Sequence, residues 1–270
     1  MFSFLARFKR PSDPAAPRRC PFGFDRLKKA APGLNAPASA AVVPAAADGP
    51  LADALKARTA EAHTRAEKHP IQERMVKGLV TRGEYAAWLH RMLPIWEAVD
   101  ASVGRLARSD ARVAAIHQPY HPHAHRVADD LAFLGERPGA AMGAAAGVAE
   151  HVERLTGGPT PVAVLGVWYV LEGSANGGRF IAKALSRALN IPGPAGLTSF
   201  DPHGEAQRER WQAWRAAVNA QRFTPAEREA IVAAAVWTFE AIYDVMEDMA
   251  GTGVGPVSTP ARGPRVAAGV

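Results

Sequence analysis

The sequence predicts an all-α protein, built as a single bundle-like domain of seven or eight helices over residues 51–250 and flanked by two disordered tails. Three observations support this fold class. Apolar residues recur at helical spacing, alternation with a period of two is nearly absent, and two capping boxes mark helix starts. A chain of 270 residues, of which 48% are apolar, is long enough to bury the core of such a domain.

The first two helices are each predicted by a different local signal. An apolar stripe at helical spacing runs from Leu51 to Ala62 and indicates the first helix. Thr81 and Glu84 then form a capping box, in which the threonine side chain accepts from the glutamate N–H and the glutamate side chain bonds back. We expect the helix that begins there to extend to about Arg108.

The last helix repeats the capping pattern with Thr224 and Glu227. Pro225 occupies the first helical position, where the missing N–H costs nothing, and apolar residues follow at helical spacing to about Ala250. The remaining helices are expected at about residues 111–134, 139–156, 160–190 with an interruption, and 203–221.

The charge of the chain is concentrated in its first residues. Residues 1–30 carry eight Lys and Arg against two Asp, which accounts for the whole net charge of +6 and leaves 24 basic and 24 acidic residues over 31–270. This neutral body argues against nucleic-acid binding by the folded part. Residues 11–50 and 251–270 are rich in Pro, Ala and Gly without periodicity and are predicted to be disordered. Residues 1–10 are apolar and basic, which fits an interfacial helix, a targeting peptide or a plain tail.

Three further absences narrow the class of protein. Cys20 is the only cysteine, so no internal disulfide or multi-thiolate metal site can form, and a reducing cytoplasm is expected. The longest uncharged apolar run, 159–171, is too short for a transmembrane helix, which needs about 20 residues. Phosphate-binding glycine loops, serine nucleophile elbows and His-Glu-x-x-His motifs are also missing, which disfavours hydrolases and nucleotide-binding enzymes.

His63 stands out among the nine histidines because of its neighbours. Glu67 follows one helical turn later, where its carboxylate can accept from the second ring N–H, as behind a metal-ligating imidazole. Lys56 returns to nearly the same face about 10 Å away along the axis. The same His and Glu spacing also occurs in ordinary surface or capping pairs, so the pattern alone leaves both interpretations open.

The segment from Trp168 to Arg179 places three glycines in an apolar helix. Each glycine costs about 1 kcal/mol relative to alanine there, so a reason is required. Either another helix approaches closely, or the backbone lies against a flat ligand. The glycines concerned are Gly173, Gly177 and Gly178.

A second unusual segment carries alternating histidines, His121, His123 and His125, in a loop. We expect this loop to be solvated, which is favoured over the alternative that its histidines form a weak metal site.

At these residues the chain resembles heme oxygenases. The segment from Ala54 to Glu67 is similar to the family's proximal helix, and the glycine segment is similar to its distal helix. The run Asp129-Asp-Leu-Ala-Phe133 is similar to a further family helix, so the resemblance covers about residues 52–250. The phrase Tyr169-Val-Leu-Glu-Gly-Ser174 looks most like the bacterial, phytochrome-associated subgroup.

The resemblance implies a role for each site residue. Where mammalian members carry an aspartate that holds distal water, this chain has a serine, so the water network would depend on other polar and backbone groups. The expected set is His63 as iron ligand, Glu67 as its hydrogen-bond partner, Lys56 and Arg215 for the propionates, Phe239 on the pocket wall, Gly173, Gly177 and Gly178 over the porphyrin, and Ser174 and Asn176 for the water.

The resemblance also implies an activity, the oxidative cleavage of heme to biliverdin, ferrous iron and carbon monoxide. Heme would be both cofactor and substrate, with O2 as oxidant and electrons from a separate reductase or ferredoxin that could dock at Arg179 and Lys183. A monomer is expected, with a bacterial phytochrome as a candidate acceptor of the product. The alternatives are a heme carrier or sensor without turnover, a helical protein with a dinuclear iron site or no metal, and a plain interaction domain.

Overall fold

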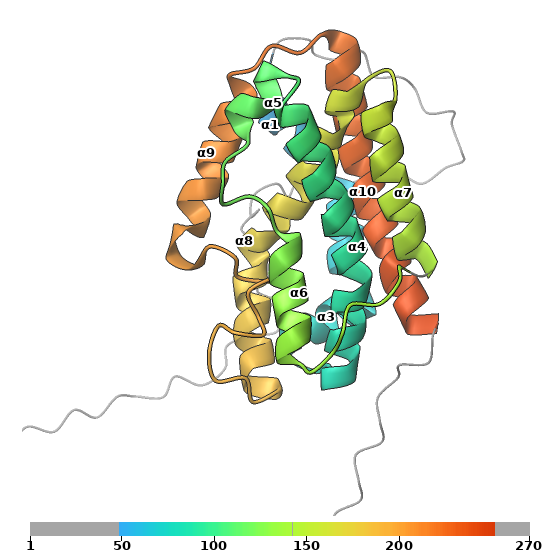
Figure 1. Cartoon of the computed structure of the whole chain (residues 1–270), viewed down its shortest axis with the longest axis vertical. Coiled ribbons are helices and arrows are strands. Elements are labelled where there is room, and N and C mark those ends of the chain that lie inside the picture. Colours follow the sequence, from blue (N-terminus) through green and yellow to red (C-terminus); the bar gives the residue numbers. More distant parts are fainter. Residues whose placement is uncertain (1–48, 142, 252–270) are drawn as a thin grey trace, which may run out of the picture.

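The described part of the chain contains helices and no strand, as predicted, although the α-helices are more numerous than the seven or eight expected. The computed structural model describes residues 49–141 and 143–251, and these contain ten α-helices, two short 3-10 helices and no strand (Figure 1). The basic leader and the C-terminal tail, predicted to be disordered, lie outside the described residues. Within the described ranges, no helix is long and apolar enough to cross a membrane.

The elements follow closely in chain order. They are α1 (Leu51–Arg58), α2 (Ala60–Glu67), α3 (Pro70–Lys77), α4 (Arg82–Ala107), α5 (Ala111–Ile116), α6 (Ala124–Phe133), α7 (Gly143–Gly157), η1 (Pro161–Ala163), α8 (Val164–Ala188), η2 (Gly204–Ala206), α9 (Gln207–Asn219) and α10 (Pro225–Gly251).

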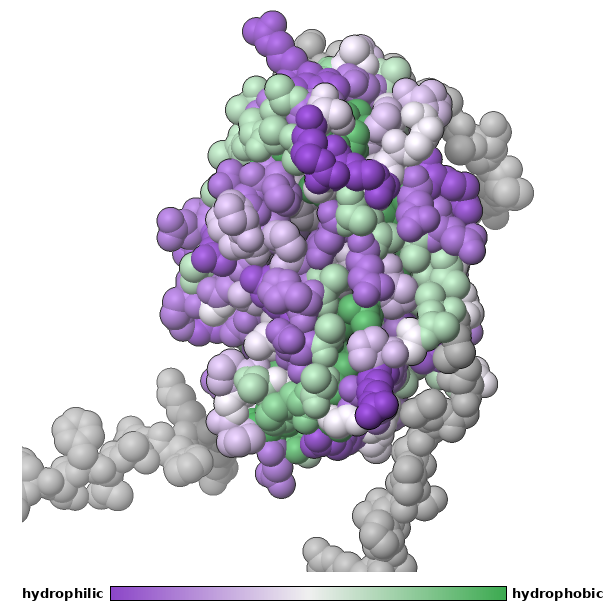
Figure 2. Space-filling view, viewed as in Figure 1, coloured by the Kyte–Doolittle hydropathy of each residue, from purple (hydrophilic) through white to green (hydrophobic). Residues whose placement is uncertain are grey.

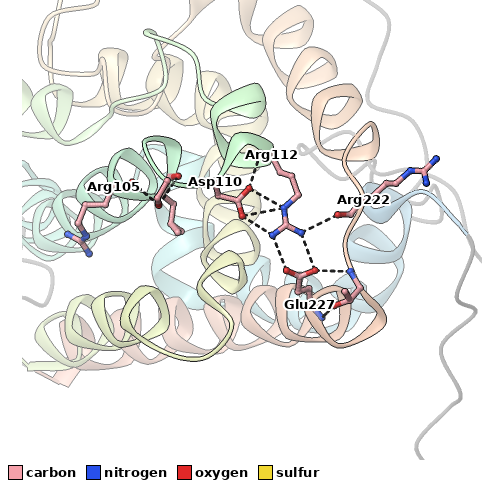
Figure 3. A network of polar contacts seen from close by, with 8 residues as sticks. Arg105, Asp110, Arg112, Arg222 and Glu227 are labelled. Atoms are coloured by element: carbon pink, nitrogen blue, oxygen red, sulfur yellow. Dashed lines mark hydrogen bonds and ion pairs between the residues drawn. The ribbon is translucent and has the colours of Figure 1, made fainter.

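Both predicted capping boxes are confirmed. Thr81 Oγ1 accepts from Glu84 N at 3.1 Å while Glu84 Oε2 accepts from Thr81 N at 2.7 Å, and Thr224 and Glu227 pair in the same way at the start of α10. The second box is also a tertiary junction. Arg112 at the start of α5 binds the carboxylates of both Asp110 and Glu227 (Figure 3). This network ties α5 to the connection between α9 and α10.

The single helix predicted at 111–134 is wrong, because α5 and α6 are separated by a loop over residues 117–123. Asp100 on α4 accepts from the backbone N–H groups of His123 and Ala124 at 2.7 and 2.8 Å, so it caps α6 from another helix. Pro119 and Pro122 lack the N–H groups that a continuous helix would require. The cap comes from a residue distant in sequence, which local patterns do not reveal.

The interruption predicted within 160–190 lies before α8, where η1 leads into the helix, and α8 itself is unbroken through its glycines. The segment expected as one proximal helix is divided at Thr59, whose hydroxyl donates to Leu55 O at 2.8 Å. An additional short helix, α3, is capped by His69. The Nδ1 of that ring accepts from Ile71 N while its Nε2 bonds to Glu247 on α10.

Helix α10 is a central packing partner in the domain, since α8, α7, α2 and α1 all pack against it. In Figure 1, α4, α7 and α10 run alongside one another, and α8 and α9 form the other side of the molecule. The face in Figure 2 is mostly hydrophilic, with apolar colouring gathered near the lower ends of α6 and α8.

The crossing of α8 over α10 is exceptionally close. A Cβ atom at Gly166 would lie 2.0 Å from the carbonyl oxygen of Ile231 and 2.7 Å from the backbone nitrogen of Ala235. Both neighbours are backbone atoms, so a side chain cannot be accommodated by rotation. Only glycine permits this approach, and sequence reasoning did not single out this position.

We therefore expect Gly166→Ala to destabilise the protein by at least about 3 kcal/mol, the upper range for an overpacked core position. Gly147→Ala is the matched control, because Gly147 lies exposed in the middle of α7 with nothing within 4 Å of an added Cβ. That control should gain about 1 kcal/mol from helix propensity. Urea unfolding followed by circular dichroism measures both, and a wild-type midpoint for Gly166→Ala would contradict the crossing.

Candidate active site

A cavity of about 760 Å³ is lined by residues of α1, α2, α8 and α10, with further contributions from α3, α4, α9 and the loop after α8. Its volume falls within the usual range for small-molecule sites, and its lining is mostly apolar with a few polar groups. Among the lining residues are Asp53 and Lys56 of α1, His63 and Glu67 of α2, and Gly173, Ser174 and Gly178 of α8.

His63 and Glu67 lie together at this cavity. His63 Nδ1 is 3.6 Å from Glu67 Oε2, and each side chain is 20% exposed. Phe239 of α10 meets the imidazole edge-on, with ring centroids 5.2 Å apart. Burial lowers the pKa of His63, although the Glu67 carboxylate acts in the opposite direction. The result is a neutral imidazole whose Nδ1 lies beside a carboxylate, an arrangement common behind metal-ligating histidines.

The two basic residues of the predicted site are placed differently. Lys56 lines the cavity, whereas Arg215 on α9 is absent from the lining as far as the described residues show. Arg215 Nη2 instead donates to Asp53 Oδ1 at 2.7 Å, and Asp53 does line the cavity. This ion pair is substantially exposed, so it contributes little stability and an acidic ligand group can compete with Asp53 for the guanidinium.

The predicted residues of α8 divide between the cavity and its surroundings. Gly173, Ser174 and Gly178 line the cavity, while Asn176 and Gly177 are outside its lining within the described part of the chain. Ser174 Oγ donates to Leu171 O at 2.6 Å, and Asn176 Nδ2 donates to Gly173 O at 2.8 Å. Both polar side chains therefore bond their own helix backbone.

The glycines of α8 have distinct structural causes. A Cβ at Gly178 would lie 2.1 Å from the carbonyl oxygen of Phe200, so this glycine admits the loop that follows α8. A Cβ at Gly173 would instead meet the Trp211 ring at 3.1 Å, beside the cavity. Close backbone approach thus explains Gly178, as it does Gly166, while Gly173 makes room for the Trp211 ring at the cavity wall.

The loop that packs on Gly178 is held by a buried carboxylate. Asp130 of α6 accepts from Thr198 N and Ser199 N at 2.9 and 2.8 Å, and from the Thr198 hydroxyl at 2.8 Å. Tyr85 adds a bond from its hydroxyl to Gly196 O at 2.7 Å. Because Ser199 and Phe200 line the cavity, Asp130 positions part of its wall.

The expectation that the histidine loop is solvated is wrong for His121 and His123, which are each 3% exposed, and holds for His125, which is exposed. His123 stacks on Trp96 at 4.0 Å and bonds Ser199 O at 3.0 Å, while His121 accepts from Gln118 N at 2.9 Å. Burial is the main cause that lowers the pKa of both rings to about 3. Within the described residues no cluster with metal-ligating geometry occurs.

The residues of the cavity wall that sequence reasoning missed include Ser199, Phe200 and Trp211. Ser199 and Phe200 carry no recognisable motif, and their position depends on the distant Asp130. Trp211 had a weak signal, since an aromatic residue on a polar helix four positions before Arg215 shares its face.

Comparisons with known proteins identify a family. The heme oxygenase family model matches residues 49–248. Human heme oxygenase 1 is 27% identical over 206 residues, which cover 74% of this chain and 71% of that protein.

Solved structures show the same fold. Heme oxygenase-2 from Synechocystis, determined with heme and NO, superposes with a TM-score of 0.69 at 21% identity, over 76% of this chain and 86% of that one. Heme oxygenase from Leptospira interrogans superposes with a TM-score of 0.68 at 22% identity, over 74% and 100%. With a family match over most of the folded domain and a cavity that presents His63 beside Glu67, this chain belongs to the heme oxygenase family.

Proposed function

We propose that the chain binds heme in this cavity and cleaves it oxidatively to biliverdin, ferrous iron and carbon monoxide. The observation that carries the proposal is the neutral imidazole of His63, which lines a largely apolar cavity with its Nδ1 toward Glu67 while α8 contributes a glycine at the same cavity. When bound, heme supplies the iron at which O2 is reduced and the porphyrin that is oxidised.

The residues present fit such a ligand. The α8 wall of the cavity includes a run of small residues, Gly173, Ser174, Ala175 and Gly178. Small residues let a flat macrocycle approach the helix, which long side chains would prevent. Aromatic and aliphatic residues from α4, α8 and α10 complete an apolar lining suited to a porphyrin.

Each polar residue has a task in this proposal. His63 ligates the iron, and Glu67 orients its ring and raises its basicity through Nδ1. Lys56 and Arg215 hold the acidic substituents, Arg215 by exchanging its Asp53 partner. Phe239 fixes the imidazole from the other side.

Ser174 and Asn176 supply neutral hydrogen-bonding groups where an aspartate would supply a carboxylate. Both side chains donate to backbone carbonyls of α8, which leaves the serine oxygen able to accept a hydrogen bond from water. We assign water ordering at the cavity to Ser174, which lines it, and a role in holding the helix backbone to Asn176 and Gly177.

Electrons and product transfer involve other molecules. We assign electron delivery to a separate reductase or ferredoxin, as the sequence offers no flavin or nicotinamide site. The Tyr169–Ser174 phrase supports membership of the phytochrome-associated subgroup, with a bacterial phytochrome as acceptor of the bilin.

One observation favours a second function, a heme carrier or sensor without turnover. The carboxylates that line the cavity, Asp53 and Glu67, come from α1 and α2, and α8 contributes none within the described lining. A carrier requires the iron ligand and the apolar wall but no proton supply on the α8 side.

The His63→Ala variant should lose the imidazole-ligated absorption spectrum of the hemin complex while its far-ultraviolet circular dichroism stays unchanged. Glu67→Gln should keep that spectrum and bind hemin about tenfold more weakly, as expected when the partner of a metal-bound histidine is neutralised. His125→Ala is the matched control, because that imidazole is exposed. An unaltered spectrum for His63→Ala would show that another residue is the ligand.

Turnover separates the two functions. Purified protein is mixed with hemin and then supplied with O2 and ascorbate or a ferredoxin system, and absorption is followed over time. We expect the Soret band to decay into a broad bilin absorption. A Soret band that persists under several electron donors would instead identify a carrier, and no Soret shift on mixing would reject heme binding.

A further inference from the structure

Trp211 of α9 forms the cavity wall at Gly173. The side chain is 9% exposed, and its ring atoms Cη2 and Cζ2 would lie 3.1 and 3.4 Å from a Cβ at Gly173. The six-membered edge of the indole therefore lies against the backbone of α8, beside the cavity that both residues line. The position of this edge sets how much of the α8 backbone a planar ligand can reach.

The plane of the indole is fixed by two other aromatic rings. Trp214 stacks on it with ring centroids 5.5 Å apart and an interplanar angle of 13°, and Tyr169 of α8 lies 5.5 Å away at 42°. Both of these rings are buried. Rotation of Trp211 is thus restricted, and the place of its edge along α8 follows from the place of α9 itself.

A buried polar chain joins α8 to α9 immediately beside this contact. Glu172 precedes Gly173, Arg210 precedes Trp211, and His203 bridges them. His203 Nε2 is 3.2 Å from Glu172 Oε1, and Arg210 Nη1 is 2.8 Å from His203 Nδ1. A guanidinium can only donate, so Nδ1 accepts and the ring proton on Nε2 is donated to Glu172.

In this Glu172–His203–Arg210 clamp the glutamate and histidine side chains are buried, whereas Arg210 is half-buried. The side chains of Glu172 and His203 are 3% and 1% exposed. The guanidinium of Arg210 lies 4.2 Å over the ring of Tyr120, and Arg126 of α6 interacts electrostatically with Glu172. Removal of the carboxylate would leave two arginines near each other without a buried counter-charge, which is strongly unfavourable.

Helix α9 also carries Arg215, one turn after Trp211, and Arg215 pairs with the cavity residue Asp53. One helix therefore presents an apolar edge and a basic group in a fixed register. A planar macrocycle with acidic substituents, such as a porphyrin, would meet the Trp211 edge in the cavity and would reach Arg215 by displacing Asp53 from it. A shift of α9 would move the wall and the basic group together.

We propose that Trp211 is a specificity-determining residue that selects the in-plane orientation of the bound porphyrin, and that Glu172 and His203 are positioning residues that hold it. This inference rests on the proposed heme binding. Its chemical consequence is that a single edge of the unsymmetrical protoporphyrin IX is presented to the site.

The test compares Trp211→Phe and Glu172→Ala with wild type as cyanide complexes of hemin, using the proton NMR shifts of the ring methyl groups. Phenylalanine keeps an aromatic ring but removes the indole edge at Gly173. Wild type should give one dominant set of methyl shifts. Each variant should give a second set of at least about one fifth of the intensity, and zinc protoporphyrin IX should bind about tenfold more weakly by fluorescence titration.

Two control variants accompany the test. Trp237→Phe removes the same atoms from a tryptophan on α10 that packs against His151 and does not line the cavity. Glu205→Gln breaks an exposed ion pair with Arg179 that joins η2 to α8 close to the clamp. Neither control should change the methyl shifts or the affinity. A second set of shifts in both controls would show that any packing change produces it and would overturn the proposal.

Circular dichroism decides whether each variant folds. If Glu172→Ala does not fold, Glu172→Gln replaces it, because the amide oxygen still accepts from His203 while the charge is lost. A methyl pattern like that of wild type in Trp211→Phe would overturn the inference and leave the proposed function intact. Failure of the wild-type protein to bind hemin would instead reject both.

Discussion

The close crossing of α8 over α10 at Gly166 is the constraint on which the site depends. Backbone contact without an intervening side chain brings the two helices together, and α10 also supports α2 and the Phe239 ring that meets His63. The His63 imidazole and the glycine-bearing helix α8 are thus both positioned by α10. The separation between them is a property of backbone packing, which is why a cavity persists in an otherwise densely packed core.

Buried carboxylates organise the loops around this helical frame. Asp100 and Asp130 each accept from successive backbone N–H groups, and Glu172 accepts a hydrogen bond from the ring N–H of His203. Such bonds compensate the desolvation of the charge and fix loops that lack regular structure. The buried histidines fit this arrangement, because His123 bonds Ser199 O and stacks on Trp96 as a neutral ring.

The α8 helix combines functions that a sequence pattern presents as one. Gly166 and Gly178 permit close approach of α10 and of the following loop, whereas Gly173 makes room for the edge of the Trp211 ring beside the cavity. Ser174 lines the cavity without a carboxylate, so the polar chemistry of this wall differs from an aspartate-based one. Helix α9 supplies the apolar edge and, through Arg215, the nearby positive charge.

The sequence by itself determined the helical class, both capping boxes and the pairing of His63 with Glu67, because each depends on residues within one or two turns of helix. Only the tertiary structure decided that Asp100 caps α6, that His121 and His123 are buried, and that Trp211 and Phe200 wall the cavity. These features depend on partners such as Asp100 and Asp130, which come from other helices. The local spacing of apolar residues predicts a helix. A helix cap or a cavity wall formed by residues of another helix depends on tertiary packing, which local spacing does not describe.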